Sequence, residues 1–233
     1  MQAHGGRFRR LAEERLGQFH VLAPDLRGHG RSGWEEPWTL AAHLDDLLET
    51  LAEPAAWIGH SFGGRLVLEL AAGQPELVQR AILLDPALLV PPDYAQLLAD
   101  QELETDRAFE SPETAIELAS GDYPDTPREI VEEEVRAHLE RHDDGRWRWR
   151  YSREAVAVGF VEVGKQPPRF ERLRAPTLVV AGIDSKFVSV GEAHLFRRVL
   201  GDRFELAVVT GGHRVLWDAF EETADAVERF LTS

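Results

Sequence analysis

A serine flanked by glycines is the strongest chemical signal in this chain. Ser61 lies in Gly59-His60-Ser61-Phe62-Gly63, a G-x-S-x-G pattern between an apolar stretch and a stretch of helical periodicity. A serine hydroxyl becomes a good nucleophile only when a sharp turn exposes it and a base removes its proton. The glycines permit such a turn, because larger side chains would collide where a strand runs into a helix. Ser61 is therefore the predicted nucleophile.

A histidine near the other end of the chain is the predicted base. His213 follows two glycines, Gly211 and Gly212, in a loop after an apolar stretch. Its imidazole would take the Ser61 proton as general base and return it to the leaving group as general acid. His60, beside the nucleophile, is instead predicted to pack within the turn.

The elements that position these residues alternate between apolar stretches and helical periodicity. This rhythm predicts a mostly parallel sheet flanked by helices. The predicted strands are 19–23, 56–59, 81–84, 177–181 and 204–209, and the predicted helices are 7–16, 40–51 (capped by Thr39), 63–72, 192–200 and 217–231.

Residues 87–168 lack the alternation of apolar strands and helices seen in the flanking parts of the sequence. They are called the cap segment below. Helices are predicted near 93–109, 112–120, 127–142 and 153–163, with no buried-strand pattern between them. An insertion of this kind between two strands is well placed to be a lid. The predicted division is a core of residues 1–86 and 169–233 with a helical lid, the cap segment.

Four stretches together resemble landmarks of the α/β-hydrolase superfamily and its serine hydrolase or esterase-like members. They are the Ser61 turn, residues 25–32 (DLRGHGRS), residues 175–184 (APTLVVAGID) and residues 211–213 (GGH). The resemblance implies an α/β fold and a catalytic triad in the chain order Ser, Asp, His.

The resemblance implies Asp184 as the acid that orients the base. The family usually places this acid three residues after the glycine that ends the strand, and that offset from Gly182 falls on Ser185. However, Asp184-Ser185-Lys186-Phe187 resembles a D-S-K-F variant in which the aspartate is the acid. Asp85, at the end of the preceding strand, is the alternative because some members use that position.

The oxyanion hole requires two backbone N–H donors. Phe62, directly after the nucleophile, is the predicted first donor. The resemblance implies a second donor from a His-Gly-led loop after an earlier buried strand, but no apolar run precedes the first helix. His4-Gly5 imitates such a pair, whereas Met1 or Gln2 would lie just beyond a lost His-Gly pair. Gln2 is the predicted second donor.

The first central strand is expected to be missing at the N-terminus. In the implied fold it would lie beside the nucleophile strand, and its loss leaves buried backbone groups unpaired, which is costly. We therefore expect this chain to be a shortened version of a longer protein.

The composition of the chain restricts the classes of partner that are expected. The 233 residues suit one α/β domain, and a net charge of −15 disfavours a nucleic-acid partner. No apolar run would span a membrane, and no secretory signal is seen, so a cytoplasmic location is expected. The expected partner is a small ester-like substrate, and the sequence indicates no oligomeric state.

Two patterns outside the triad are given structural interpretations. The alternating Arg and Trp residues of 146–150 are expected to form a lid segment with one apolar face. His138 and His142 lie four residues apart, a spacing that suits a metal pair, but no third ligand is evident. We predict no metal and no cofactor.

The predicted function is hydrolysis of a carboxylic ester or related acyl bond through an acyl-enzyme on Ser61. One alternative is cleavage of a C–C bond with the same triad. The other is a non-catalytic, hydrolase-like binding domain.

Overall fold

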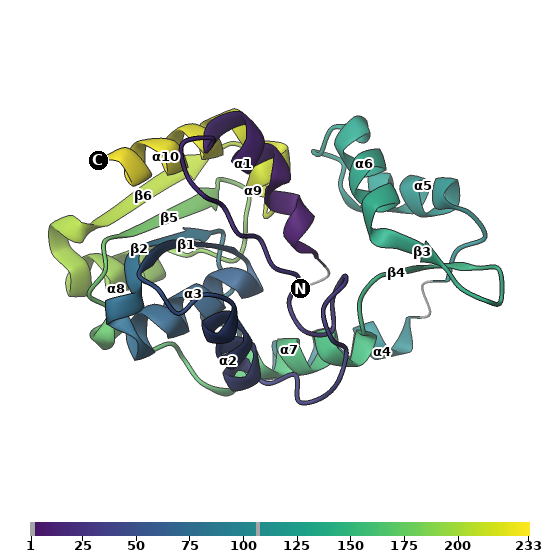
Figure 1. Cartoon of the computed structure of the whole chain (residues 1–233), viewed down its shortest axis with the longest axis horizontal. Helices are drawn as coiled ribbons and strands as arrows, with labels where there is room; N and C mark the ends of the chain where they lie inside the picture. Colours follow the sequence, from purple (N-terminus) through teal and green to yellow (C-terminus); the bar gives the residue numbers. More distant parts are fainter. Residues whose placement is uncertain (1–2, 106–107) are drawn as a thin grey trace.

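The core of the molecule is a four-stranded parallel sheet (Figure 1). A computed structural model describes residues 3–105 and 108–233. The strand order is β1-β2-β5-β6, and every neighbouring pair is parallel. The strands are β1 (Ala55–His60), β2 (Val78–Leu84), β5 (Thr177–Gly182) and β6 (Phe204–Val209). The predicted α/β class is confirmed.

Helices cover both faces of this sheet. The first half of the chain forms η1 (Gly5–Phe8), α1 (Arg9–Arg15), α2 (Leu40–Thr50) and α3 (Phe62–Gly73). The last part forms α8 (Val190–Leu200), α9 (Val215–Asp218) and α10 (Phe220–Thr232). The Thr39 cap is confirmed, since its side chain accepts a hydrogen bond from the Ala42 N–H at 3.2 Å. Within the described ranges, no helix is long and apolar enough to cross a lipid bilayer.

Side chains of the central strands divide between two apolar clusters. In β2, Ala81 and Leu83 pack in one cluster with residues of α3 and α8. Ile82 and Leu84 pack in the other with residues of α1 and α10. Successive residues of a strand point to opposite faces, so this alternation places the sheet between two helical layers. Figure 1 shows α1 and α10 side by side in one of these two helical layers.

The predicted strand at 19–23 is wrong. These residues carry no strand assignment, and Phe19, Val21 and Leu22 are exposed. A strand is stabilised by hydrogen bonds to a neighbouring strand. Within residues 3–105 and 108–233, β1 has a strand partner on one side only, β2, which agrees with the expected absence of a central strand beside it.

The cap segment, which lies between β2 and β5, contains helices and a hairpin. Its elements are α4 (Pro92–Glu104), α5 (Pro112–Asp122), α6 (Arg128–His138), β3 (Leu139–Arg141), β4 (Trp147–Trp149) and α7 (Arg153–Lys165). The hairpin was not predicted, and the predicted helix 127–142 ends early because residues 139–141 pair with β4. Trp147 and Trp149 pack on the small apolar cluster of α5 and α6. In Figure 1, α5, α6 and the hairpin lie across from the sheet.

Candidate active site

The candidate site forms at the carboxyl ends of the four parallel strands. Ser61 directly follows β1, Asp85 directly follows β2, and the loops after β5 and β6 carry Ser185 and His213. Because parallel strands end at the same edge of a sheet, residues far apart in sequence converge there.

Ser61 occupies a strained turn between β1 and α3. Its φ is +54°, a left-handed conformation that non-glycine residues rarely adopt. The Ser61 N–H donates to the Leu84 carbonyl at 3.0 Å, which ties the turn to β2. A Cβ on Gly59 would lie 2.2 Å from the Gly63 carbonyl oxygen, so the first glycine of the motif is required by close backbone approach.

A hydrogen-bonded relay joins three side chains. His213 Nε2 lies 3.0 Å from Ser61 Oγ, and His213 Nδ1 lies 2.5 Å from Asp85 Oδ2. With a proton on Nδ1, the free Nε2 lone pair faces the serine hydroxyl. This is the arrangement that activates a serine nucleophile.

The structure brings Asp85, and not Asp184, to the imidazole. This corrects the placement expected for Asp184 from the family resemblance. The Asp184 N–H donates to the Gly211 carbonyl at 3.0 Å, which continues the pairing of the chain beyond β5, and the Asp184 side chain is exposed. Asp85 is fully buried at the end of β2, and its carboxylate contacts the imidazole instead.

Two donors hold the Asp85 carboxylate in place. The Gly182 N–H donates to Oδ1 at 3.3 Å, and the Ser185 hydroxyl donates to Oδ2 at 2.5 Å. Burial raises the pKa of Asp85, whereas both hydrogen bonds lower it. The two donors therefore offset part of the cost of burying the anion that faces His213.

His213 is held from two further sides. His60 Nε2 donates to the His213 backbone carbonyl at 2.7 Å, and the Phe187 ring lies 4.3 Å from the His213 ring, centroid to centroid. Burial lowers the pKa of His213, so its imidazole is neutral at pH 7 and can accept a proton. Burial also lowers the pKa of His60, which keeps that ring neutral.

Sequence reasoning missed the role of Ser185. The signal was present, because Ser185 is the residue at the family's usual acid offset from Gly182. The Ser185 hydroxyl contacts Asp85 and accepts a hydrogen bond from the Phe187 N–H at 3.2 Å. Ser185 and Phe187 of the D-S-K-F stretch thus contact the Asp85 carboxylate and the His213 ring, respectively.

The predicted first oxyanion donor lies at the start of a helix. Phe62 is the first residue of α3, and the N–H groups of a first helical turn have no acceptor within the helix. The Gly5 N–H donates to Asp25 Oδ1 at 2.8 Å, so the His4-Gly5 pair is occupied with another acceptor. Gln2 lies outside the described residues.

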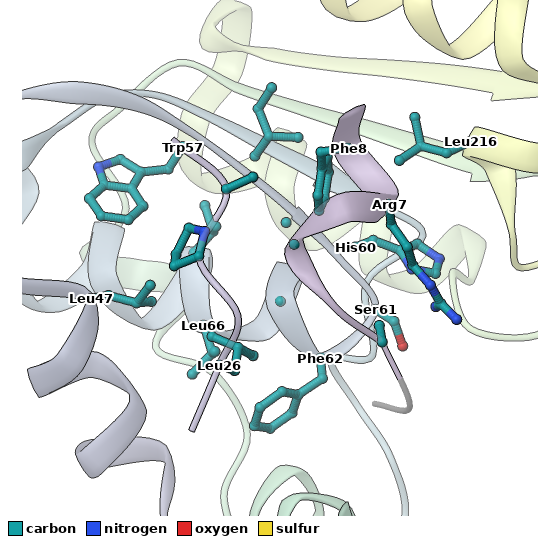
Figure 2. Close-up of a pocket in the computed structure, with 18 of the residues that line it drawn as sticks. Arg7, Phe8, Leu26, Leu47, Trp57, His60, Ser61, Phe62, Leu66 and Leu216 are labelled. Carbon is teal, nitrogen blue, oxygen red and sulfur yellow. The ribbon is translucent and has the colours of Figure 1, made fainter. Parts of the chain in front are cut away.

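An apolar cavity of about 640 Å³ adjoins Ser61. Its lining comes from the N-terminal helices, residues 19–24, β1 and the cap segment, and it includes His213. Figure 2 shows Phe8, Trp57, Leu66 and Leu216 around this space, with Ser61 at its edge. The cavity has the size range of small-molecule sites.

Replacing Ser185 by Ala is expected to move the acid side of the activity profile to higher pH. The change removes a donor to the Asp85 carboxylate, so the pKa of Asp85 rises further, and the ionised form is then present only at higher pH. A hydrogen bond to a charged group contributes about 1.5 kcal/mol, which corresponds to a midpoint shift of about 1 pH unit. The measurement is kcat/KM against pH for an activated ester.

The matched variant Ser185→Thr keeps the hydroxyl and is expected to keep the profile of the original chain. An unchanged acid-side midpoint in Ser185→Ala would show that Ser185 does not act through Asp85.

Comparisons with known proteins identify the family of this chain. A family model described as the alpha/beta hydrolase family matches residues 3–226. Lipase LipV of Mycobacterium tuberculosis is 32% identical over 222 residues, which cover 91% of this chain and 83% of the lipase. The sn-1-specific diacylglycerol lipase ABHD11 of Mus musculus is 27% identical over 91% of this chain and 71% of its own length.

Solved structures extend the likeness to the whole fold. The crystal structure of E-2-(acetamidomethylene)succinate hydrolase superposes with a TM-score of 0.87 and 25% identity, covering all of this chain and 89% of that one. The Mycobacterium tuberculosis esterase Rv0045c superposes with a TM-score of 0.79 and 26% identity, covering all of this chain and 82% of that one. The chain therefore belongs to the alpha/beta hydrolase family, as an enzyme whose relatives include lipases and esterases.

Proposed function

We propose that this enzyme hydrolyses carboxylic esters with an apolar acyl group through an acyl-enzyme on Ser61. The observation that carries the proposal is the relay from Ser61 Oγ to His213 Nε2 and from His213 Nδ1 to Asp85, at 3.0 Å and 2.5 Å. The lipase and esterase names of LipV and Rv0045c support an ester as the substrate.

In the first half-reaction His213 Nε2 takes the Ser61 proton while Oγ attacks the ester carbonyl carbon. The carbonyl oxygen becomes an oxyanion, which the Phe62 N–H stabilises at the start of α3. His213 then gives its proton to the departing alcohol, and the C–O bond to the alcohol breaks. Asp85 offsets the positive charge that the imidazole carries between these two steps.

In the second half-reaction a water molecule replaces the alcohol. His213 accepts one water proton while the water oxygen attacks the acyl carbon. The bond to Ser61 Oγ breaks, and the proton passes from His213 to Oγ. The products are the carboxylic acid and the original enzyme.

The cavity next to Ser61 supports an apolar acyl group. Side chains such as Phe8, Leu66 and Leu216 present hydrocarbon surface to it. Burying an acyl chain there is favourable by about 0.8 kcal/mol for each methylene group. Val90, Tyr94 and Phe160 of the cap segment also line the cavity, which supports a role of this segment as a lid.

A fluorophosphonate probe tests the nucleophile directly. We expect one covalent adduct on the peptide that contains Ser61, and none in Ser61→Ala. A second assay compares p-nitrophenyl acetate with the butyrate, and the apolar cavity predicts the larger kcat/KM for the butyrate. Folded protein that forms no adduct would favour the non-catalytic alternative, and an adduct without ester turnover would favour C–C cleavage.

A further inference from the structure

Three potential metal ligands meet where the cap segment contacts the N-terminal segment. They are His4, just before η1, and Glu134 and His138 on α6. One potential ligand atom from each lies within 4.8 Å of the other two. Glu134 and His138 are four residues apart and so share one face of their helix. His138 belonged to the spacing noted in the sequence, but its neighbours here are Glu134 and His4 rather than His142.

His138 presents a buried nitrogen that no described residue satisfies. Its side chain is 2% exposed, and Nε2 has no hydrogen-bond partner among the described residues. A buried polar atom without a partner is costly and calls for a bound group or a special role.

The separations suit a small tetrahedral ion. His4 Nε2 lies 3.3 Å from Glu134 Oε1. Bonds of about 2.0 Å in a tetrahedral zinc site place two ligand atoms roughly 3.3 Å apart. The remaining separations are at most 4.8 Å, so these side chains must rotate to bring their ligand atoms to about 3.3 Å from one another.

A small cavity lies beside two of the three potential ligands, Glu134 and His138. Its volume is about 30 Å³, and its lining includes Glu134, His138 and Arg7. A space of this size accommodates about one water molecule. Two imidazoles, one carboxylate and one water form a ligand set that zinc accepts.

Arg7 shares the carboxylate and will weaken the binding of a cation. Its Nε donates to Glu134 Oε1 at 2.6 Å. A carboxylate has two oxygens and about four lone-pair directions, so Glu134 can contact Arg7 and a metal ion together. The expected affinity is therefore lower than that of a closed structural zinc site.

We propose that His4, Glu134 and His138 bind a divalent transition-metal ion, with zinc as the best fit, and that this ion joins α6 of the cap segment to the N-terminal segment. Nitrogen ligands favour zinc, cobalt, nickel and copper over magnesium and calcium. The site is separate from the relay of Ser61, His213 and Asp85, and the proposal does not depend on the proposed function.

Cobalt is the probe for the test, because Co²⁺ bound to nitrogen and oxygen ligands absorbs visible light. The full chain is first treated with a chelator and then titrated with Co²⁺. We expect one Co²⁺ per chain, displaced by Zn²⁺. His138→Asn and Glu134→Gln are each expected to weaken binding at least about tenfold.

His142→Asn is the matched control. It also removes an imidazole beside a carboxylate, since His142 Nε2 lies 3.4 Å from Glu140 Oε1, but on an exposed part of the hairpin. We expect His142→Asn to bind like the original chain. Because His138 is buried, His4→Asn provides a second loss variant at a more accessible residue, and circular dichroism checks that each variant is folded.

Undiminished Co²⁺ binding in folded His4→Asn and Glu134→Gln would overturn the proposal. So would a loss of binding that occurs only in His142→Asn, or only in His213→Asn, which would place the ion at the hairpin or at the relay instead.

Discussion

Replacing Asp85 by Asn is expected to lower kcat by about 10⁴-fold, the order of loss typical when the acid of such a relay becomes an amide. Asp85 Oδ2 accepts from His213 Nδ1 at 2.5 Å. An asparagine NH₂ in that place donates, which favours the imidazole tautomer with its proton on Nε2. That tautomer cannot take the Ser61 proton. The measurement is kcat for p-nitrophenyl butyrate.

The Asp85→Asn variant should fold, which makes the measurement interpretable. Asp85 has a φ of +41°, and asparagine tolerates this left-handed region as well as aspartate does. Asp184→Asn is the matched control, and we expect its kcat to change less than about twofold, because the Asp184 side chain is exposed. Loss of activity in Asp184→Asn with retention in Asp85→Asn would reverse this assignment of the acid.

Replacing Arg65 by Met is expected to destabilise the fold by about 3–5 kcal/mol, the cost of breaking a buried charged network. Arg65 lies on α3 and is 1% exposed. Its Nε donates to Glu69 Oε1 at 2.8 Å. Its two terminal nitrogens donate to the carbonyls of Leu88, Val163 and Gln166 at 3.2, 3.2 and 2.6 Å. Methionine fills similar space and satisfies none of these acceptors.

The same network links the nucleophile helix to the cap segment. Leu88 lies where the chain leaves β2 for the cap segment, while Val163 and Gln166 lie at the end of α7, where it returns. Replacing Arg65 therefore removes the hydrogen bonds that hold both connections between the core and the cap segment. Thermal unfolding should show a decrease in Tm of roughly 6–20 °C for a chain of this size.

Arg198→Met on α8 is the control for the Arg65 variant. Arg198 is exposed, and an exposed substitution away from such networks changes stability by about 0.5 kcal/mol or less. Equal Tm values for the two variants would mean that the buried network of Arg65 does not stabilise the fold.

The sequence predicted those parts of the molecule that depend on neighbouring residues. The glycines around Ser61 predicted the strand-turn-helix, because close backbone approach at Gly59 is a local requirement. The continuous apolar run at 177–181 predicted β5, which is buried along its whole length. The prediction of a strand at 19–23 was wrong, because an apolar stretch forms a strand only beside a neighbouring strand to which it can hydrogen-bond.

The partners of these local elements were decided by the tertiary structure. Ser61 and His213 are 152 positions apart and meet only because β1 and β6 end at the same edge of one sheet. Whether Asp85 or Asp184 faces the imidazole depends on the pairing of Asp184 with Gly211, which keeps that side chain exposed, and no motif encodes this pairing.

The cluster of His4, Glu134 and His138 depends on the tertiary structure still more. In the sequence, His138 was noted together with His142, four residues away, because a sequence shows only the spacing of residues along the chain. Packing of α6 against the N-terminal segment brings in a ligand from 134 positions away. The sequence therefore determined which side chains could do chemistry, and long-range packing decided which of them act together, since distance in space is set by the sheet and its helices rather than by order in the chain.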